Sequence, residues 1–325
     1  MVSIEEDFNR AYENIQQREP VAYYAISCLD DFLQGIYEDD LVIITAQTGA
    51  GKTELAYDIA YSNAKNKKVL LYALEADIDE PIKRRQYKIF ADLYYADTDK
   101  DKPYQDFSYR NFMNNKLVLD KYVDKARKLY CAESKPTIVY YEPDFNIDSF
   151  KQKLLSTNKD YDLIILDHLD YFDVLDNVSE NAQMSNIMKE LRLVNTMLKK
   201  PVIAISHLRK NTRKTLMPTI DDLMGSSNKA KQAKIVITLA PDKEGFVENG
   251  LHPTYISIQK SRYGSTGNLL IKQVYDSKTN MYQQGYSLYN YNAYEDKVEA
   301  LDLEKYPQWA KNQNWSKKGE GNENI

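Results

Sequence analysis

The sequence is short of the residues that cross-link chains or hold structural metals. It has two cysteines, Cys28 and Cys131, which lie far apart, and three histidines among 325 residues. These numbers exclude a disulfide framework and disfavour a structural zinc site. Apolar runs of the roughly 18 residues that cross a bilayer are also missing, and the acidic N-terminus does not form a secretory signal. We therefore expect a protein of the reducing cytoplasm without a membrane partner.

Basic residues are not in excess, because the formal net charge is −5. This balance excludes a protein coated in positive charge, although a locally basic channel can still bind nucleic acid inside an acidic shell. Glycine and proline are scarce, at 11 and 10 residues, and no stretch rich in them divides the chain. We expect one domain over residues 21–302, preceded by a helix at 1–20 and followed by a polar tail without fixed structure at 303–325.

Apolar residues near the N-terminus recur at the spacing of an amphipathic helix. Ile4, Phe8, Tyr12 and Ile15 follow one another at intervals of four, four and three, and Pro20 closes the pattern. A single helix of this kind has to bury its apolar stripe. Two surfaces are available to it, its own domain or a neighbouring subunit.

Strand and helix patterns alternate over roughly the next 200 residues, and strands then follow without long helices between them. This order predicts a largely parallel sheet with an antiparallel extension. The strands are expected at 39–46, 67–77, 136–141, 161–172 and 201–210, and then at 233–240, 254–262 and 268–276.

The stretch "ITAQTGAGKTELA" joins an apolar strand to a helix through a glycine-containing loop. A phosphate-binding loop needs backbone N–H groups aimed at the anion, a lysine for the outer phosphates and a Ser or Thr hydroxyl for Mg²⁺. Lys52 and Thr53 supply the last two, although Ala46 stands where the general pattern has its first glycine. An ordinary turn is the weaker alternative. The expected nucleotide-binding residues are Gly49, Ala50, Gly51, Lys52, Thr53 and Glu54.

Hydrolysis of a bound nucleotide requires two further carboxylates at strand ends. Asp167 follows four apolar residues, the usual place for an acid that supports Mg²⁺, and Glu75 ends the neighbouring strand. Because parallel strands end at one edge of a sheet, we expect both side chains there. His207 ends a third strand, where it either senses the γ-phosphate or caps the edge of the core.

These segments together resemble the RecA-type ATPase domain of the DnaB family of replicative hexameric helicases. The resemblance covers residues 25–285 and is carried by the loop, by "VLLYALEAD", "YDLIILDHLDYF" and "PVIAISHLRK", and above all by "KSRYGSTG" at 260–267. It implies an α/β, RecA-like P-loop NTPase fold. Its mostly parallel central sheet would be flanked by helices and carry an antiparallel C-terminal extension.

The resemblance also implies roles for these residues, with ATP as substrate and Mg²⁺ as its metal. Lys52 and Thr53 would bind phosphate and Mg²⁺, Glu75 would activate water, and Asp167 would support the metal. His207 stands where the family has a glutamine that couples the γ-phosphate to DNA, which leaves its coupling role open.

Two residues of "KSRYGSTG", Lys260 and Arg262, would act in the active site of a neighbouring subunit. Arg262 would be the arginine finger, with a surface turn as the alternative. A finger in trans requires a homo-oligomer, a hexameric ring or a filament, and the N-terminal helix would dock on the adjacent subunit as a linker helix does in the family.

A basic run after the strand at 201–210 is the expected contact with single-stranded DNA. Six copies would line a channel that binds the DNA backbone, while a solvated surface loop is the alternative. The predicted DNA-binding residues are Arg209, Lys210, Arg213, Lys214, Lys229 and Lys231.

The sequence therefore predicts an ATP-dependent DNA helicase that unwinds duplex, with 5′ to 3′ polarity by family analogy. The alternatives are a RecA-type ATPase that binds DNA without unwinding it, and a regulatory ATP-binding module whose output is oligomerisation. We expect no N-terminal collar domain, which is typical of a compact phage or mobile-element helicase. A loader or primase partner is not specified.

Overall fold

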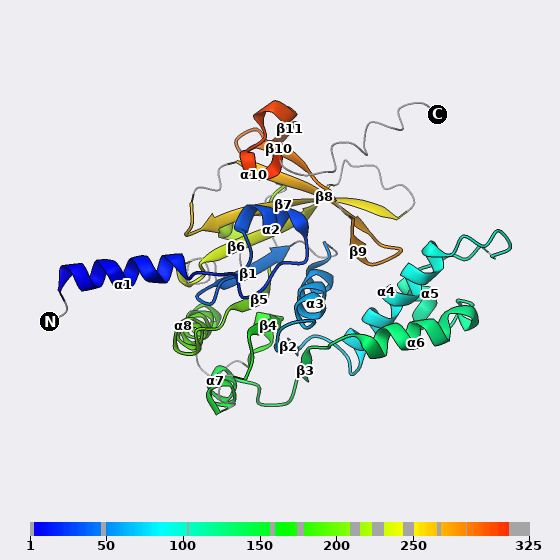
Figure 1. The fold of residues 1–325 in the computed structure, drawn as a ribbon, viewed down its shortest axis with the longest axis horizontal. Coiled ribbons are helices and arrows are strands. Elements are labelled where there is room, and N and C mark those ends of the chain that lie inside the picture. Colours follow the sequence, from blue (N-terminus) through cyan, green and yellow to red (C-terminus); the bar gives the residue numbers. More distant parts are fainter. Residues whose placement is uncertain are drawn as a thin grey trace.

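The computed structural model describes residues 3–46, 50–102, 104–156, 160–173, 179–208, 215–222, 231–242, 250–264, 268–283 and 285–311. Over these residues one large sheet carries helices on both faces (Figure 1). No helix in the described ranges is long and apolar enough to cross a membrane.

The sheet is parallel in its first half and antiparallel in its second, as the sequence predicts. Its strand order is β11-β10-β8-β7-β6-β1-β5-β4-β2-β3, with β9 paired to β8. The parallel strands are β3 (Thr137–Tyr140), β2 (Val69–Ala73), β4 (Leu163–Asp167), β5 (Val202–His207), β1 (Leu41–Ala46) and β6 (Ile235–Pro241). The antiparallel strands are β7 (Leu251–Ser261), β8 (Leu269–Asp276), β9 (Met281–Tyr282), β10 (Ser287–Asn292) and β11 (Lys297–Ala300).

Helices cover both faces of the parallel half. Every residue of β1, β2 and β4 is buried, which explains their uninterrupted apolar sequences. One face packs against α2 (Ser27–Leu33), α3 (Lys52–Asn63) and α10 (Gln308–Lys311). The other packs against α7 (Ile147–Ser156) and α8 (Glu180–Leu198). Short 3₁₀ turns lie at η1 (Asp120–Tyr122), η2 (Leu169–Tyr171), η3 (Ile220–Asp222) and η4 (Leu303–Lys305).

A helical insertion between β2 and β3 has a small core of its own. It contains α4 (Glu80–Ala96), α5 (Tyr109–Met113) and α6 (Val123–Ala132), packed around aromatic side chains such as Tyr87 and Phe107. Ion pairs from Arg84 and Lys88 join α4 to α3, the helix that follows the expected phosphate-binding loop. Figure 1 shows the insertion on the opposite side of the molecule from α1.

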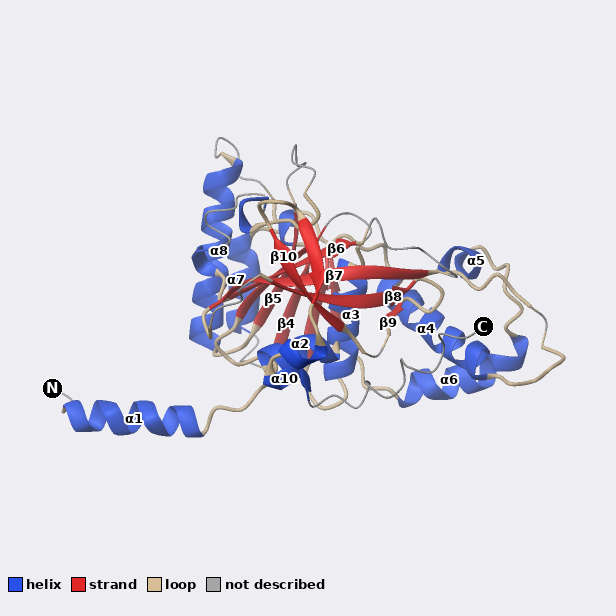
Figure 2. Cartoon of the chain, turned by 90° about the horizontal axis from the view of Figure 1, so that it is seen from above, coloured by secondary structure: helices blue, strands red, loops and turns tan. Residues whose placement is uncertain are grey.

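The N-terminal helix α1 (Ile4–Gln16) projects away from the domain (Figure 2). Ser3 and Glu6 form a reciprocal cap: the Glu6 N–H donates to Ser3 Oγ at 3.1 Å, and the Ser3 N–H donates to Glu6 Oε2 at 2.7 Å. No residue of α1 is buried, and Ile4 is 90% exposed. The apolar stripe of α1 therefore does not pack on its own domain, which was one of the two surfaces considered for it.

The packed part of the chain extends beyond the expected boundary at residue 302. Tyr306 and Ala310 are buried, and the Trp309 ring lies edge-on to Phe32 with centroids 5.1 Å apart. The polar composition of this segment concealed the short helix α10, which packs on α2. The expectation of an unstructured tail from residue 303 is therefore wrong for 303–311, and residues 312–325 lie outside the described ranges.

Candidate active site

The loop expected to bind phosphate connects β1 to the N-terminus of α3. Gly49 lies outside the described residues, while Gly51 is the N-cap of α3 and has φ of 79°. This left-handed conformation favours glycine, and a Cβ there would meet Tyr282 Oη at 3.0 Å. The first N–H groups of α3 are thus available to an anion at the end of β1.

Lys52 lies in the first turn of α3 and is buried. Its Nζ donates to the Ala46 carbonyl at 3.3 Å, so the ammonium folds back over the mouth of the loop. Burial lowers the pKa of Lys52, and the charges of Glu75, Asp167 and Asp170 act in the opposite direction. Lys52 is therefore a cation shielded from water and close to carboxylates. This environment suits it to bind an anionic group together with that group's metal ion.

Asp167 ends β4 and is completely buried beside Thr53. The Thr53 hydroxyl is 3.5 Å from Asp167 Oδ1, while Asp167 Oδ2 has no hydrogen-bond partner among the described residues. Burial and then the charge of Glu75 raise the pKa of Asp167 to about 7. A buried carboxylate oxygen left without a partner, next to a hydroxyl, fits the oxygen ligands that Mg²⁺ prefers.

Glu75 lies at the same edge, held by the backbone of the adjacent strand. The N–H groups of Leu74 and Glu75 both donate to the Asp167 carbonyl, at 2.7 and 3.3 Å. Its Oε2 lies 2.6 Å from His168 Nε2. The Glu75 side chain is about half exposed, so its carboxylate is both oriented and open to water.

His168 is a residue that the sequence analysis missed, although it directly follows Asp167 at a strand end. Its ring stacks on His207 with centroids 4.2 Å apart and 11° between planes, and the His207 N–H donates to Asp170 Oδ2 at 2.8 Å. Glu75, His168 and His207 bring possible metal ligands within 4.8 Å of one another. The in-plane lone pairs of two nearly parallel stacked rings do not converge on one ion, so this geometry fits a stacked pair with a polar partner on His168 better than a metal centre.

Two further predicted nucleotide-binding residues make contacts within the protein. The Ala50 carbonyl accepts a hydrogen bond from the Tyr282 hydroxyl at 3.2 Å. The Glu54 carboxylate is buried in ion pairs with Arg84 and with Lys88, the latter at 2.9 Å. Any part that Glu54 takes in phosphate binding therefore comes from its backbone N–H.

Lys260 and Arg262 lie at the other edge of the sheet. Because β7 is antiparallel to β6, its last residue Ser261 pairs with Ile235, the first residue of β6. That residue lies beside Val42, near the start of β1, whereas the phosphate loop follows Ala46 at its end. A strand advances about 3.3 Å per residue, so the length of β1 keeps Arg262 roughly 17 Å from the loop of its own chain.

The two basic side chains contact backbone carbonyls of the segment before β6. Lys260 Nζ donates to the Ala233 carbonyl at 2.6 Å, and Arg262 Nη2 donates to the Lys231 carbonyl at 3.4 Å. Burial, followed by the charges of Arg262 and Arg192, lowers the pKa of Lys260. This edge therefore presents several cations close together.

Most of the predicted DNA-binding residues lie outside the described ranges. These are Arg209, Lys210, Arg213, Lys214 and Lys229. Lys231 is described and exposed, and its backbone carbonyl accepts from Lys260 and Arg262. A link between the expected DNA loop and the "KSRYGSTG" motif is thus present in the backbone of residue 231.

Comparisons with known proteins agree on one family. The family model described as the DnaB-like helicase C terminal domain matches residues 24–284. The replicative DNA helicase DnaB of Mycoplasma pneumoniae is 21% identical over 262 residues, 74% of this chain and 52% of that protein. The DnaB of Geobacillus stearothermophilus is 23% identical over 253 residues, with the same coverage. The chain thus spans about half the length of the curated relatives it matches.

Solved structures share the fold. One, described as a DnaB-like replicative helicase and its interactions with primase, superposes with a TM-score of 0.70 at 19% identity, covering 87% of this chain and 67% of that chain. A second, an ATPase domain, has a TM-score of 0.65 at 20% identity and covers 92% and 99% of the two chains. The RecA-like arrangement predicted from the sequence is confirmed by these superpositions and by the strand order.

Proposed function

Because the chain belongs to the DnaB-like helicase C-terminal domain family, we propose that it is an ATP-driven motor that moves along single-stranded DNA and unwinds duplex DNA. The observation that carries the proposal is the division of the machinery between two edges of one sheet. Lys52, Asp167 and Glu75 gather at one edge, and Arg262 lies at the other. One edge of each chain would complete the site of the next.

The phosphate groups of ATP lie, in this proposal, against the N-terminus of α3. Lys52 neutralises their charge, and the backbone N–H groups after Gly51 donate to them. Thr53 and Asp167 would hold Mg²⁺, which when bound would neutralise charge on the phosphates. The buried Asp167 oxygen without a hydrogen-bond partner fits this role, since an ionised carboxylate there would have a cation beside it.

Glu75 accepts a proton from the water that attacks the γ-phosphorus, and ADP leaves on the opposite side. The hydrogen bonds from the Leu74 and Glu75 N–H groups to the Asp167 carbonyl fix the backbone position of Glu75. His168 contacts one oxygen of the Glu75 carboxylate. Stacking of His168 on His207 connects this carboxylate to the residue expected to sense the γ-phosphate. Loss of that phosphate on hydrolysis can therefore be transmitted through β5 toward the basic run that follows it.

Arg262 stabilises the charge of the transferring phosphoryl group in the neighbouring subunit, with Lys260 beside it. Its separation from the phosphate loop of its own chain supports action in trans. A contact between two different surfaces repeats head to tail and closes as a ring or continues as a filament. We propose the ring, a hexamer by family analogy, with 5′ to 3′ polarity on the same basis.

The exposed helix α1 is proposed to dock on a second copy of the chain. A cavity of about 270 Å³ between α4 and α6 is lined by Ile89, Phe90 and Tyr130 among others, and it lies on the far side of the molecule from α1 (Figure 1). The charges of the two helices are complementary. Acidic residues predominate in α1, at Glu5, Glu6, Asp7 and Glu13 against Arg10, and basic residues in α6, at Lys125, Arg127 and Lys128 against Asp124.

This docking is tested by placing a charge on the apolar stripe of α1. Phe8→Glu removes an aromatic contact worth about 1.5–3 kcal/mol, so self-association should weaken by about 10- to 100-fold in sedimentation velocity. Asn9→Glu adds the same charge one position away, off the stripe, and should leave association nearly unchanged. Equal behaviour of the two variants would contradict docking through the apolar face.

Single-stranded DNA is proposed to contact the basic run, including Lys231, from the centre of the ring. Contacts of this kind are made to the sugar–phosphate backbone and weaken steeply with salt. The motor would act in the cytoplasm of a bacterial or phage-infected cell, where its curated relatives are replicative helicases.

The deciding experiment measures ATP hydrolysis with and without single-stranded DNA across a salt series, together with unwinding of a tailed duplex. A DNA motor should be stimulated several-fold at low salt and lose that stimulation as salt rises. Stimulation without unwinding would favour a DNA-binding ATPase that does not separate strands. A rate indifferent to DNA at every salt concentration would favour the regulatory ATP-binding module.

A further inference from the structure

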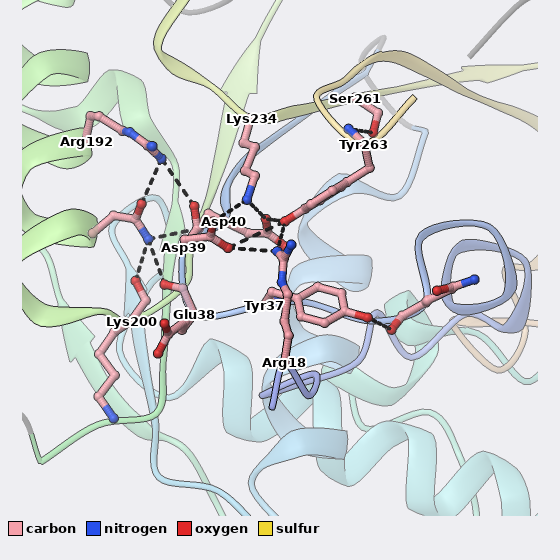
Figure 3. Close-up of polar contacts among 12 residues, drawn as sticks. Arg18, Tyr37, Glu38, Asp39, Asp40, Arg192, Lys200, Lys234, Ser261 and Tyr263 are labelled. Atoms are coloured by element: carbon pink, nitrogen blue, oxygen red, sulfur yellow. Dashed lines mark hydrogen bonds and ion pairs between the residues drawn. The ribbon is translucent and has the colours of Figure 1, made fainter. Parts of the chain in front are cut away.

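Arg18 joins the base of helix α1 to the turn that carries Arg262. Its guanidinium contacts two neighbouring tyrosine rings, 4.3 Å from the Tyr37 centroid and 4.7 Å from the Tyr263 centroid, and the ring centroids are 6.1 Å from each other (Figure 3). It also donates to the Tyr263 hydroxyl and, at 2.9 Å, to Asp39 Oδ1. The polar contacts of this side chain therefore converge on Tyr263 and its neighbours.

Tyr263 is in turn anchored to the interior of the domain. Its hydroxyl donates to Oδ1 of the fully buried Asp40 at 2.6 Å, and Lys234 Nζ lies 4.4 Å from its ring centroid. Lys234 also pairs with Asp39 and Asp40, and its carbonyl accepts the Arg262 N–H at 3.1 Å. Because Tyr263 directly follows Arg262, these contacts fix the backbone from which Arg262 extends. We call Arg18, Tyr37, Asp39, Asp40, Lys234 and Tyr263 the Arg18 cluster.

The last turn of α1 is otherwise loosely attached. Cavities of about 420 and 510 Å³ border Arg18, and both also reach Ile15 of α1. No residue of α1 itself is buried. A force on α1 therefore reaches the domain near Arg18, next to the turn that carries Arg262.

We propose that Arg18 is a positioning residue for Arg262, so that seating of α1 on a neighbouring copy and placement of the finger are mechanically linked. This inference rests on the proposed function, since Arg262 acts in trans there. With α1 seated, Arg18 holds Tyr263 against Asp40, and the Arg262 side chain starts from a fixed point. Without Arg18, Tyr263 keeps its contacts with Asp40, Lys234 and the Tyr37 ring. It loses the guanidinium on its own ring and the hydrogen bond from Arg18 to its hydroxyl.

The first experiment compares full-length Arg18→Ala with Arg10→Ala, a matched loss of arginine from α1. Arg10 pairs with Asp7 inside its own helix. Arg18→Ala should lower kcat by about 10- to 100-fold, because small displacements of a catalytic group have costs of that order, with little change in KM for ATP. Arg10→Ala should leave kcat unchanged, and Arg18→Lys, which keeps the charge but not the planar stacking, should recover only part of the loss.

The second experiment asks which partner of the interface Arg18 serves. Subunits of Arg18→Ala are co-assembled with Glu75→Ala subunits, whose fingers are intact, and separately with Arg262→Ala subunits. The first mixture should hydrolyse ATP at least about fivefold faster than the average of its separate components, because intact fingers serve intact sites. The second mixture should show no gain, since one variant lacks Arg262 and the other does not hold Arg262 in position.

The opposite pattern, gain with Arg262→Ala and none with Glu75→Ala, would place the defect in the site of the Arg18→Ala chain and overturn the inference. So would full recovery of kcat at high protein concentration, which would mean that Arg18 acts only on assembly. If Arg262→Ala itself hydrolyses ATP like the wild type, the proposed function fails and the inference fails with it. If Arg262→Ala is inactive while Arg18→Ala is normal, only the inference fails.

Discussion

The proposed division of the active site between two chains is best tested by mixing two inactive variants. Arg262→Ala removes the charge proposed to meet the transferring phosphoryl group, and Glu75→Ala removes the group proposed to activate water. Each change should lower the turnover of the pure variant by about 10³-fold or more. Nucleotide binding should be spared in both, because Lys52 and the start of α3 are untouched.

The recovered rate follows from the geometry. Each interface combines the site of one chain with the finger of the next, because Arg262 and the phosphate loop lie at opposite edges of the sheet. In a random one-to-one mixture, half the sites keep Glu75 and half the fingers keep Arg262. About a quarter of the interfaces then keep both, so the mixture should recover about a quarter of the wild-type rate if the sites act independently.

The assay is steady-state ATP hydrolysis with single-stranded DNA, after the two variants have exchanged subunits. A mixture of Glu75→Ala with Lys52→Ala is the matched control, since both defects lie in the site and no interface regains a complete set. Failure of the first mixture to exceed this control, with binding and assembly intact, would refute action of Arg262 in trans.

Three further predictions concern single side chains at the edge of the sheet where the phosphate loop lies. Lys52→Ala should abolish turnover and weaken ATP binding, measured by fluorescent-nucleotide titration, because the Lys52 ammonium lies beside Ala46, where the loop begins. Burial raises the pKa of Asp167 from 3.8 to about 7, so the folded chain binds the extra proton between these values and the contribution of Asp167 to the free energy of unfolding falls as pH rises from about 4 to 7. Asp167→Asn should remove that fall, raising stability at pH 8 by up to about 4 kcal/mol in urea titrations without nucleotide or Mg²⁺, and should change little at pH 4. His207→Ala should lose stimulation by DNA while keeping most of the basal rate, and His207→Gln should retain stimulation, since an amide can replace the ring as a hydrogen-bonding group.

The residues near the phosphate loop could be predicted because the sequence on either side of each one indicates its place in a strand, loop or helix. Asp167 ends an apolar run, Gly51 is the N-cap of a helix, and Glu75 follows β2, whose last residue pairs with Asp167 in a parallel order. The α/β order and the antiparallel extension follow from the spacing of strands and helices along the chain. In these cases the sequence neighbours of a residue determine its place in the fold.

The residues that the sequence analysis missed depend on contacts between distant segments. Arg18 and Tyr263 are 245 positions apart, and neither carries a local pattern that points to the other. The contact of His168 with Glu75 requires β4 to lie next to β2, and the contact of Trp309 requires Phe32 of α2 beside it. A polar segment such as 303–311 reads as a tail unless the surface that it covers is known.

The change from parallel to antiparallel pairing within the sheet explains why the proposed active site would need a neighbouring copy of the chain. In the parallel half every strand ends at the same edge, so Lys52, Glu75, Asp167 and His207 gather there although helices separate these strands along the chain. A finger motif at the end of another parallel strand would lie beside the phosphate loop of its own chain. Because β7 reverses direction, the same motif ends at the opposite edge, where it can serve only a different molecule. The reversal also places Tyr263 beside Asp40 and within reach of Arg18, so one topological feature brings the finger and the exposed helix together at the same edge of the domain.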